Sequence, residues 1–146
     1  MVQTTYEKSN AVTNVRLNSF NKSYAKAMLS SKENRTDRLR KAQKLLDYLC
    51  DKFKIASVSI EVTDNKRPLK WNSAQVYGKY YPSVRHIVIY NATAKTNKTI
   101  SIKSFYDTLL HEFIHHYDFC ELEFTESPHT KGFYMRIKDL KEKLGY

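Results

Sequence analysis

The sequence contains few of the residues that staple a chain or interrupt its regular structure. Its 146 residues include 2 cysteines, 3 glycines and 3 prolines. Cys50 and Cys120 form no CxxC pair and are too few for a disulfide framework, which excludes a disulfide-rich scaffold and favours a reducing compartment. The scarcity of glycine and proline favours regular helices and strands joined by short connections.

Long hydrophobic runs are also missing from the sequence. A transmembrane helix needs about 20 consecutive apolar residues, so we expect no membrane span and no membrane partner. Residues Met1–Tyr6 are not followed by the apolar stretch that a secretory signal requires. Together these absences predict a cytoplasmic protein.

Acidic residues are scarce relative to basic ones, with 15 Asp and Glu against 25 Lys and Arg. The imbalance is uneven, because residues 1–54 carry a net charge of +7 and residues 55–104 one of +6, whereas residues 105–146 carry −3. A basic surface attracts polyanions, above all nucleic acids. A lysine-rich chain can also reflect biased codon usage, so the charge leaves nucleic-acid binding open.

Apolar and aromatic residues are plentiful, with 41% hydrophobic residues, 11 Tyr and 7 Phe. This composition excludes a disordered polar chain, and the length predicts one domain. Residues 1–14 are polar and are expected to be loose. Beyond them, the apolar periodicity predicts helices over residues 17–28 and 39–53, a strand over 56–63, a hairpin of 76–81 and 84–90 around Pro82-Ser83, a helix from an N-cap at Ser104 to Phe119, and a last helix from Ser127-Pro128 to Leu144. This order predicts an α+β fold with a small three-stranded sheet.

One helix carries the pattern H-E-x-x-H, from His111 and Glu112 to His115. Residues i and i+4 share one face of a helix, so two imidazoles one turn apart can bind one Zn²⁺. Glu112 then lies beside the metal rather than on it. It can act as the general base for a zinc-activated water that attacks a peptide bond. The motif therefore predicts a zincin-like zinc metallopeptidase.

A catalytic zinc usually has three protein ligands and an open position. His129 is our preferred third ligand, because it starts a helix that follows the motif helix after a short connection. His116 points about 100° away around the helix, and His86 lies on the predicted hairpin as a packed strand residue. An acidic ligand remains an alternative, at Asp118, Glu121, Glu123 or Glu126.

The pattern around these histidines resembles the SprT-like family of zinc metalloprotease domains, which includes the Spartan protease domain. His129 is followed four residues later by the aromatic Phe133, and the segments Trp71–Ala74, Gly78–Tyr81 and Ile87–Tyr90 look like the aromatic-led hairpin of that family. The resemblance covers about residues 37–143. It implies that residues 35–146 form the metalloprotease domain, with residues 1–34 as a polar segment and first helix. It also implies a peptidase that acts on proteins near DNA.

Other residues are candidates to bind DNA, to bind the substrate or to assist catalysis. Arg38, Arg40, Lys41 and Lys44 are predicted to line the outer face of a helix and to contact DNA phosphates, and Trp71 could stack on an exposed base. The strand Val84–Tyr90 could be an edge to which an extended protein or peptide substrate adds. Four tyrosines are candidates to stabilise the oxyanion: Tyr80, Tyr81, Tyr117 and Tyr134. Asp107 or Asp118 could orient a ligand histidine.

Two other readings stay open. The first is a nucleic-acid-binding module whose zinc is structural, closed by a fourth ligand such as Cys120 or Glu121. The second is a compact zinc peptidase with a glutamate as third ligand and no role on DNA. The coordination shell separates these readings from the first, because a catalytic zinc keeps one position open.

Overall fold

The protein is described here by a computed structural model that covers residues 2–66, 77–93 and 98–146. Trp71 therefore lies outside the described residues. Within them the elements are α1 (Thr5–Ala11), α2 (Ser23–Leu29), α3 (Arg35–Phe53), β1 (Ser59–Lys66), β2 (Gly78–Tyr81), β3 (His86–Ala92), α4 (Ile102–Cys120) and α5 (Lys131–Leu144). The expected α+β fold with a three-stranded sheet is confirmed. None of these helices is both long and apolar enough to span a membrane.

The sheet has the strand order β1-β3-β2. β1 runs parallel to β3, with Ile60 opposite Ile87, and β2 pairs antiparallel with β3, with Tyr80 opposite Ile87. The predicted hairpin around Pro82 is therefore confirmed. The expectation that residues 84–90 form an edge is wrong, because β3 is the central strand. Among the described strands, β1 and β2 form the edges.

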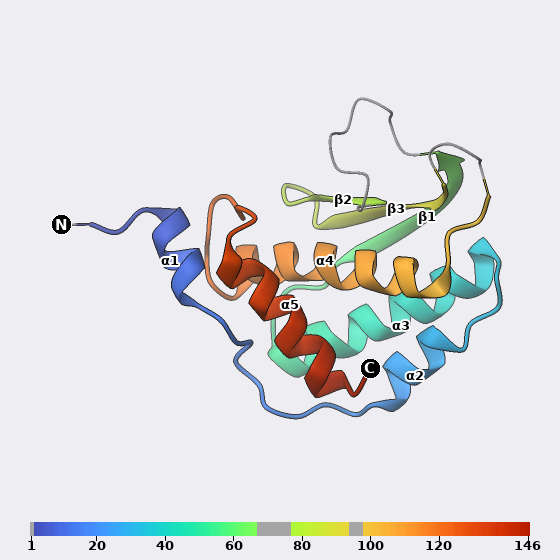
Figure 1. Cartoon of the computed structure of the whole chain (residues 1–146), viewed down its shortest axis with the longest axis horizontal. Helices are drawn as coiled ribbons and strands as arrows, with labels where there is room; N and C mark the ends of the chain where they lie inside the picture. The colour runs from blue at the N-terminus through green and yellow to red at the C-terminus, as the bar shows by residue number, and fades with distance from the viewer. Residues whose placement is uncertain (1, 67–76, 94–97) are drawn as a thin grey trace.

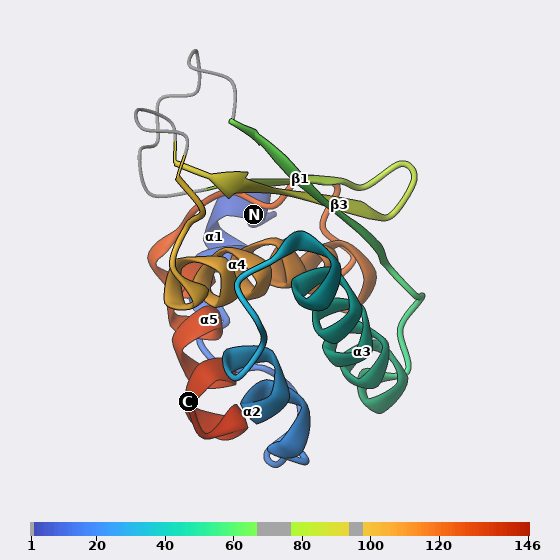
Figure 2. The same cartoon turned by 90° about the vertical axis from the view of Figure 1, so that its right-hand side faces the viewer.

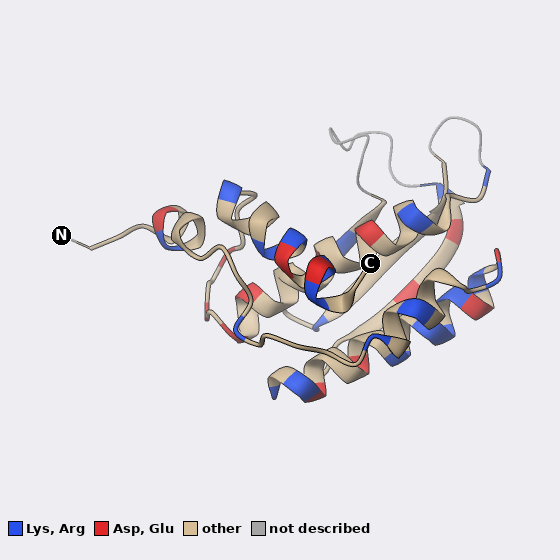
Figure 3. Cartoon of the chain, turned by 60° about the horizontal axis from the view of Figure 1, so that its bottom comes forward, with Lys and Arg blue, Asp and Glu red and all other residues tan. Residues whose placement is uncertain are grey.

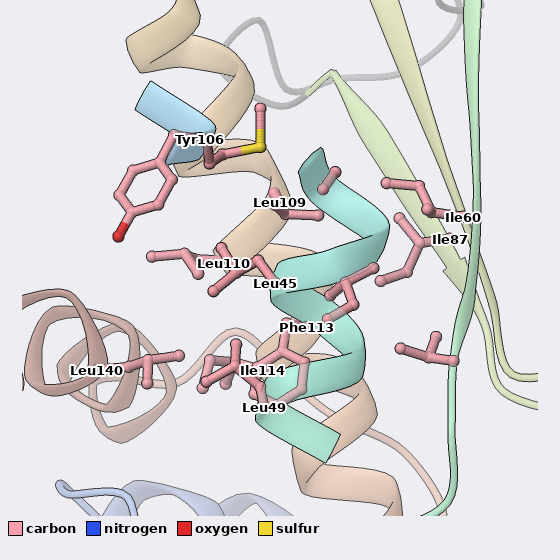
Figure 4. Packing of buried hydrophobic residues seen from close by; sticks show 14 of the residues in the cluster. Leu45, Leu49, Ile60, Ile87, Tyr106, Leu109, Leu110, Phe113, Ile114 and Leu140 are labelled. Carbon is pink, nitrogen blue, oxygen red and sulfur yellow. The ribbon is translucent and has the colours of Figure 1, made fainter. Parts of the chain in front are cut away.

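The helices lie on one side of the sheet (Figures 1 and 2). α4 passes beneath the strands with α3 beside it, and α5 and α2 lie farther from the sheet. Figure 4 shows the resulting core, in which Leu45 and Leu49 of α3 meet Phe113 of α4, while Ile60 and Ile87 point in from the sheet. All five side chains are buried. The sheet and α3 thus form a rigid support for α4.

α4 is buried on most of its circumference, from Phe105 to Asp118. Its N-cap is Ser101, whose side chain accepts a hydrogen bond from the Ser104 backbone N–H at 3.1 Å. The prediction of Ser104 as N-cap is therefore wrong by one turn, because both serines precede the same apolar run. The burial matters for function, since polar side chains on such a helix need partners.

The N-terminal segment differs most from expectation, because residues 5–11 form α1 where a loose chain was expected. Thr4 and Glu7 close a capping box, in which the Thr4 side chain accepts from the Glu7 backbone and the Glu7 side chain accepts from the Thr4 backbone. The next helix, α2, is shorter than the predicted 17–28 segment. Phe20 is buried before that helix begins.

α5 begins later than predicted. Its N-cap is Thr130, whose side chain accepts a hydrogen bond from the Phe133 backbone N–H at 2.9 Å. Ser127 is not the cap, because its hydroxyl is engaged by two other side chains. His129 consequently stands just before the cap rather than in the first helical turn. The helix buries Phe133, Leu140 and Leu144 along the predicted stripe.

Candidate metal centre

Three histidines converge between α4 and the start of α5. One ring nitrogen from each of His111, His115 and His129 lies within 4.8 Å of the other two. The Nε2 atoms of His115 and His129 are 3.0 Å apart. Two nitrogens that bind one tetrahedral Zn²⁺ at about 2.0–2.1 Å lie about 3.3 Å from each other, so this donor set fits a zinc ion.

The local sequence explains this convergence. His111 and His115 are one turn apart on α4, and their ring centroids are 5.0 Å apart. The chain then reverses, and the start of α5 brings the His129 ring to 4.9 Å from that of His111. Phe133, fully buried one turn into α5, packs at 4.6 Å from the His115 ring. Phe133, the aromatic residue four positions after His129, thus packs against the buried side of the histidine cluster.

The cluster is open to solvent on one side, since His111 is buried, His115 half-buried and His129 exposed. Burial, together with a smaller contribution from His129, lowers the pKa of His111 to about 4. Burial is also the main reason that the pKa values of His115 and His129 lie below their ordinary range. The three rings are therefore neutral at neutral pH, the state in which imidazole binds a metal.

His115 has a defined orientation because its second nitrogen is held. Nδ1 of His115 lies 2.8 Å from the Ser127 hydroxyl, and that hydroxyl donates to Asp118 Oδ2 at 2.7 Å. This chain favours a proton on Nδ1 and leaves Nε2 free for a metal. Of the two acids expected to orient a ligand, Asp118 does so through Ser127. Asp107 instead accepts a hydrogen bond from Lys141.

Glu112 lies on the sheet side of α4 and is not one of the convergent donors. Its carboxyl group is buried, which raises its pKa to about 8, while Lys79 opposes the shift. A Cβ atom at Gly78 of β2 would lie 3.2 Å from Cγ of Glu112 and 2.8 Å from Cγ2 of Thr108. A glycine at this position therefore lets β2 approach the helix closely beside Glu112.

The four tyrosines that were candidates to stabilise the oxyanion lie in different surroundings. The Tyr80 hydroxyl lies 2.7 Å from Nδ1 of His116, and the Tyr117 hydroxyl accepts from the Arg16 backbone N–H at 3.0 Å. Tyr81 lies at the exposed end of β2. Tyr134 is exposed too, and its ring lies 5.9 Å from that of His129. Tyr134 is therefore the one candidate placed beside the histidine cluster.

The remaining candidate ligands lie elsewhere. His116 is fully buried, with Nδ1 facing Tyr80 and Nε2 at 2.7 Å from the carbonyl oxygen of Ala56. Cys120 packs against His116, and Glu121 pairs with Arg16. His86 lies across the sheet next to Ser59. In the described part of the chain, neither the fourth ligand of a structural site nor an acidic third ligand joins the cluster.

Lys and Arg recur along α3 (Figure 3), but not all four predicted DNA contacts lie on its outer face. Arg38 is buried, and its Nη1 donates to Asn91 Oδ1 at 2.7 Å and to the carbonyl oxygen of Ile100 at 2.8 Å. Placing Arg38 on the outer face was wrong, because four- and seven-residue steps put it in line with buried residues of the same helix. Arg40 and Lys41 both pair with Asp37, while Lys44 is exposed.

Sequence reasoning missed several residues that support the cluster, among them Ser127, Gly78 and Arg136. Arg136 is fully buried and binds both oxygens of Asp118, at 3.0 and 2.8 Å. A signal for it existed, since Arg136 falls three residues after Phe133 and four before Leu140, on the buried stripe of α5. No sequence pattern marks Ser127, whose role depends on how the connection between the helices folds.

We compared the chain with protein-family models, with curated proteins and with solved structures, and none of these comparisons gives a match.

Proposed function

We propose that this protein is a zinc-dependent metallopeptidase of the SprT-like type. The observation that carries the proposal is the convergence of the three histidines with Glu112 next to them on α4 and outside the donor group. A structural zinc site would gain nothing from an acid at this position, and it would use four protein ligands. Three neutral imidazoles with one exposed side suit a site that receives a substrate.

The residues divide the chemistry between them. His111, His115 and His129 would hold Zn²⁺, which when bound supplies Lewis-acid activation of a water molecule and of the peptide carbonyl. Glu112, whose buried carboxyl group would be ionised next to the charge of bound Zn²⁺, would take a proton from the water as general base and return it to the leaving amine as general acid. Ser127 and Asp118 hold His115 in its orientation. Tyr134, whose ring lies 6.2 Å from that of His111 and 5.9 Å from that of His129, would donate a hydrogen bond to the developing oxyanion.

The substrate would lie along β2. This strand is an edge among the described strands, and its first residue, Gly78, lies close to the Glu112 side chain. An extended peptide that adds to an edge strand gains main-chain hydrogen bonds and is held straight. We therefore propose that the peptide lies alongside β2, with its scissile bond over the histidine cluster.

Action near DNA is the second part of the proposal and rests on charge. Residues 1–104 carry the whole positive excess of the chain, and Lys and Arg recur along α3 (Figure 3). With Arg38 buried, the contacts fall to Arg40, Lys41 and Lys44. Binding to phosphates would bring the enzyme close to DNA-bound proteins and raise their local concentration.

Replacing Glu112 by Gln tests the peptidase function. The change keeps the shape of the side chain and removes the base, so proteolysis should fall by about 10²–10⁴-fold while zinc binding persists. The assay measures cleavage of an unstructured protein, with and without single-stranded DNA. Zinc content is measured on the same samples.

The matched control is Glu126→Gln, which removes the same charge at an exposed position of the connection between α4 and α5. It should cleave like the wild type. If the wild type cleaves nothing under either condition, the peptidase proposal fails. Equal rates for Glu112→Gln and the wild type would assign the activity to another site or to a contaminant.

A further inference from the structure

The helix α1 is attached to the domain by polar contacts rather than by apolar packing. Ser9 is its only buried residue. Nη1 of Arg136 donates to the carbonyl oxygens of Ser9 at 2.7 Å and Val12 at 2.6 Å, and Nη2 donates to the Ser9 hydroxyl at 3.0 Å. A helix of this length is not stable alone in water. Its order therefore depends on the groups that receive it.

The Arg136 guanidinium that binds α1 also binds Asp118, which supports His115 through Ser127. Arg136 binds both carboxylate oxygens of Asp118, which accepts from Ser127, which in turn contacts Nδ1 of His115. Arg136 and Asp118 have no exposed side-chain surface, so water does not screen this pair. One continuous chain of hydrogen bonds thus joins the backbone of α1 to a proposed metal ligand.

A second set of contacts joins α1 to the residue that follows His129. The hydroxyl groups of Ser9 and Thr130 are 3.0 Å apart, and Thr130 is the N-cap of α5. Two residues further on, the backbone N–H of Gly132 donates to the Asn10 side chain at 3.2 Å. The docked helix therefore fixes the backbone immediately beyond His129 as well as the partners of His115.

Gly132 makes this docking possible. A Cβ atom there would clash with the carbonyl oxygen of Ser9 and would lie 2.7 Å from that of Asn10. Both obstacles are backbone atoms, so a side-chain rotation cannot relieve the overlap. Any residue other than glycine at position 132 must push α1 away from α5.

We propose that α1 is a positioning element of the metal site, and that docking of α1 and metal binding strengthen each other. Ser9, Thr130, Arg136, Asp118 and Ser127 are the positioning residues that connect them. The inference rests on the proposed function, because it requires that the three histidines bind zinc. Coupling between two sites is reciprocal, so zinc should hold α1 in place by the same factor by which α1 tightens zinc.

Gly132→Ala tests the coupling, with Lys131→Ala as control at the preceding, exposed position of α5. Alanine has a higher helix propensity than glycine, so a purely local effect would leave α5 and the metal site intact or more stable. We expect instead that zinc binding weakens by about 10–100-fold, the usual cost of losing outer partners of metal ligands. Affinity is measured by competition with a chelator below the unfolding temperature. The absorption of bound Co²⁺ reports the ligand geometry.

Hydrogen exchange of the α1 amides gives a readout that does not depend on the metal. Exchange should be fast in Gly132→Ala, unchanged in Lys131→Ala, and slowed by zinc in the wild type. Deleting residues 1–11 should weaken zinc binding as much as Gly132→Ala does, and combining the two should add nothing further, because both remove the same contact.

The outcomes separate the two proposals. If Gly132→Ala frees α1, or the deletion removes it, while zinc affinity and the Co²⁺ spectrum match those of the control, the coupling is overturned and the metal site stands. If the wild type shows no zinc binding that depends on His111, the proposed function fails and the coupling fails with it.

Discussion

Two adjacent histidines of α4 have opposite environments. His115 has one nitrogen held by Ser127, while the other faces His129 at 3.0 Å. His116, on the other side of the helix, uses both nitrogens within the protein, one with Tyr80 and one with the carbonyl of Ala56. A ring with one nitrogen left for an outside partner is prepared for a metal. A ring with both nitrogens in use joins elements of the fold.

The comparison shows that burial and residue type do not by themselves identify a ligand. His116 is more deeply buried than His115, and burial lowers the pKa of both. What differs is that His115 keeps one ring nitrogen outside the hydrogen bonds that hold the fold, whereas His116 does not. For His116 the partners are supplied by the sheet edge and by the chain before β1, so the side chain ties α4 to the sheet.

Removing each imidazole in turn tests whether His115 and His116 have different roles. His115→Ala should lower zinc affinity by more than about 100-fold, beyond the loss expected for an outer partner. His116→Ala should leave zinc affinity on the folded protein unchanged. It should lower the free energy of unfolding by about 2–4 kcal/mol, because it leaves the Tyr80 hydroxyl and the Ala56 carbonyl without their partner.

The measurements are metal titration and urea unfolding of the metal-free proteins. His86→Ala, at a half-buried histidine of β3 away from both sites, controls for the general cost of losing an imidazole. A loss of zinc affinity in His116→Ala equal to that in His115→Ala would contradict the division between the two faces.

A smaller effect is expected from removing the Ser127 hydroxyl, which contacts Nδ1 of His115. Ser127→Ala removes the group that lies between His115 and Asp118, so the ring loses its fixed orientation. Zinc affinity should fall by about tenfold, with stability affected less than in His116→Ala. Isothermal titration with Zn²⁺ measures this, and Ser104→Ala, a serine of α4 outside the cluster, is the control. Affinity equal to the wild type would remove Ser127 from the support of the site.

The smallest expected effect lies at the basic surface of α3. Reversing Arg40 and Lys44 to Glu should weaken DNA binding alike for all sequences and lower the slope of log affinity against log salt by up to about 2. Fluorescence anisotropy over a salt series measures both quantities. The control is the same reversal at Lys131 and Lys138, which are exposed on α5. An absence of binding by the wild type at low salt would remove DNA from the proposed function.

The histidine cluster could be predicted because its geometry is mostly local. The i, i+4 spacing puts His111 and His115 on one face whatever the rest of the fold does, and a short connection limits where His129 can lie. The predicted helix start was wrong, because the N-cap of α5 is Thr130 and the Ser127 hydroxyl contacts His115 and Asp118 instead. That use of Ser127 depends on a tertiary contact, which no local pattern encodes.

Two predictions, for Arg38 and for residues 1–14, were wrong because they relied on residue composition rather than on residue spacing. Arg38 was assigned to the surface because of its charge, although its spacing to Ala42 and Leu45 places it on the buried face of α3. The polar residues 1–14 were assigned to a loose segment, although Thr4 and Glu7 have the spacing of a capping box. In both cases the local geometric signal was present in the sequence and pointed to the structure found.

Among the described strands, the two that form the sheet edges differ in features that affect association with other chains. Beyond Thr63, β1 leaves its regular register with β3, and its outward positions carry the exposed charges Glu61, Asp64 and Lys66. An irregular, charged edge discourages pairing with strands of other molecules. β2, at the other edge, is only 4 residues long. The longer edge strand, β1, is thus protected against pairing with other chains. The short edge strand, β2, stays available beside Glu112.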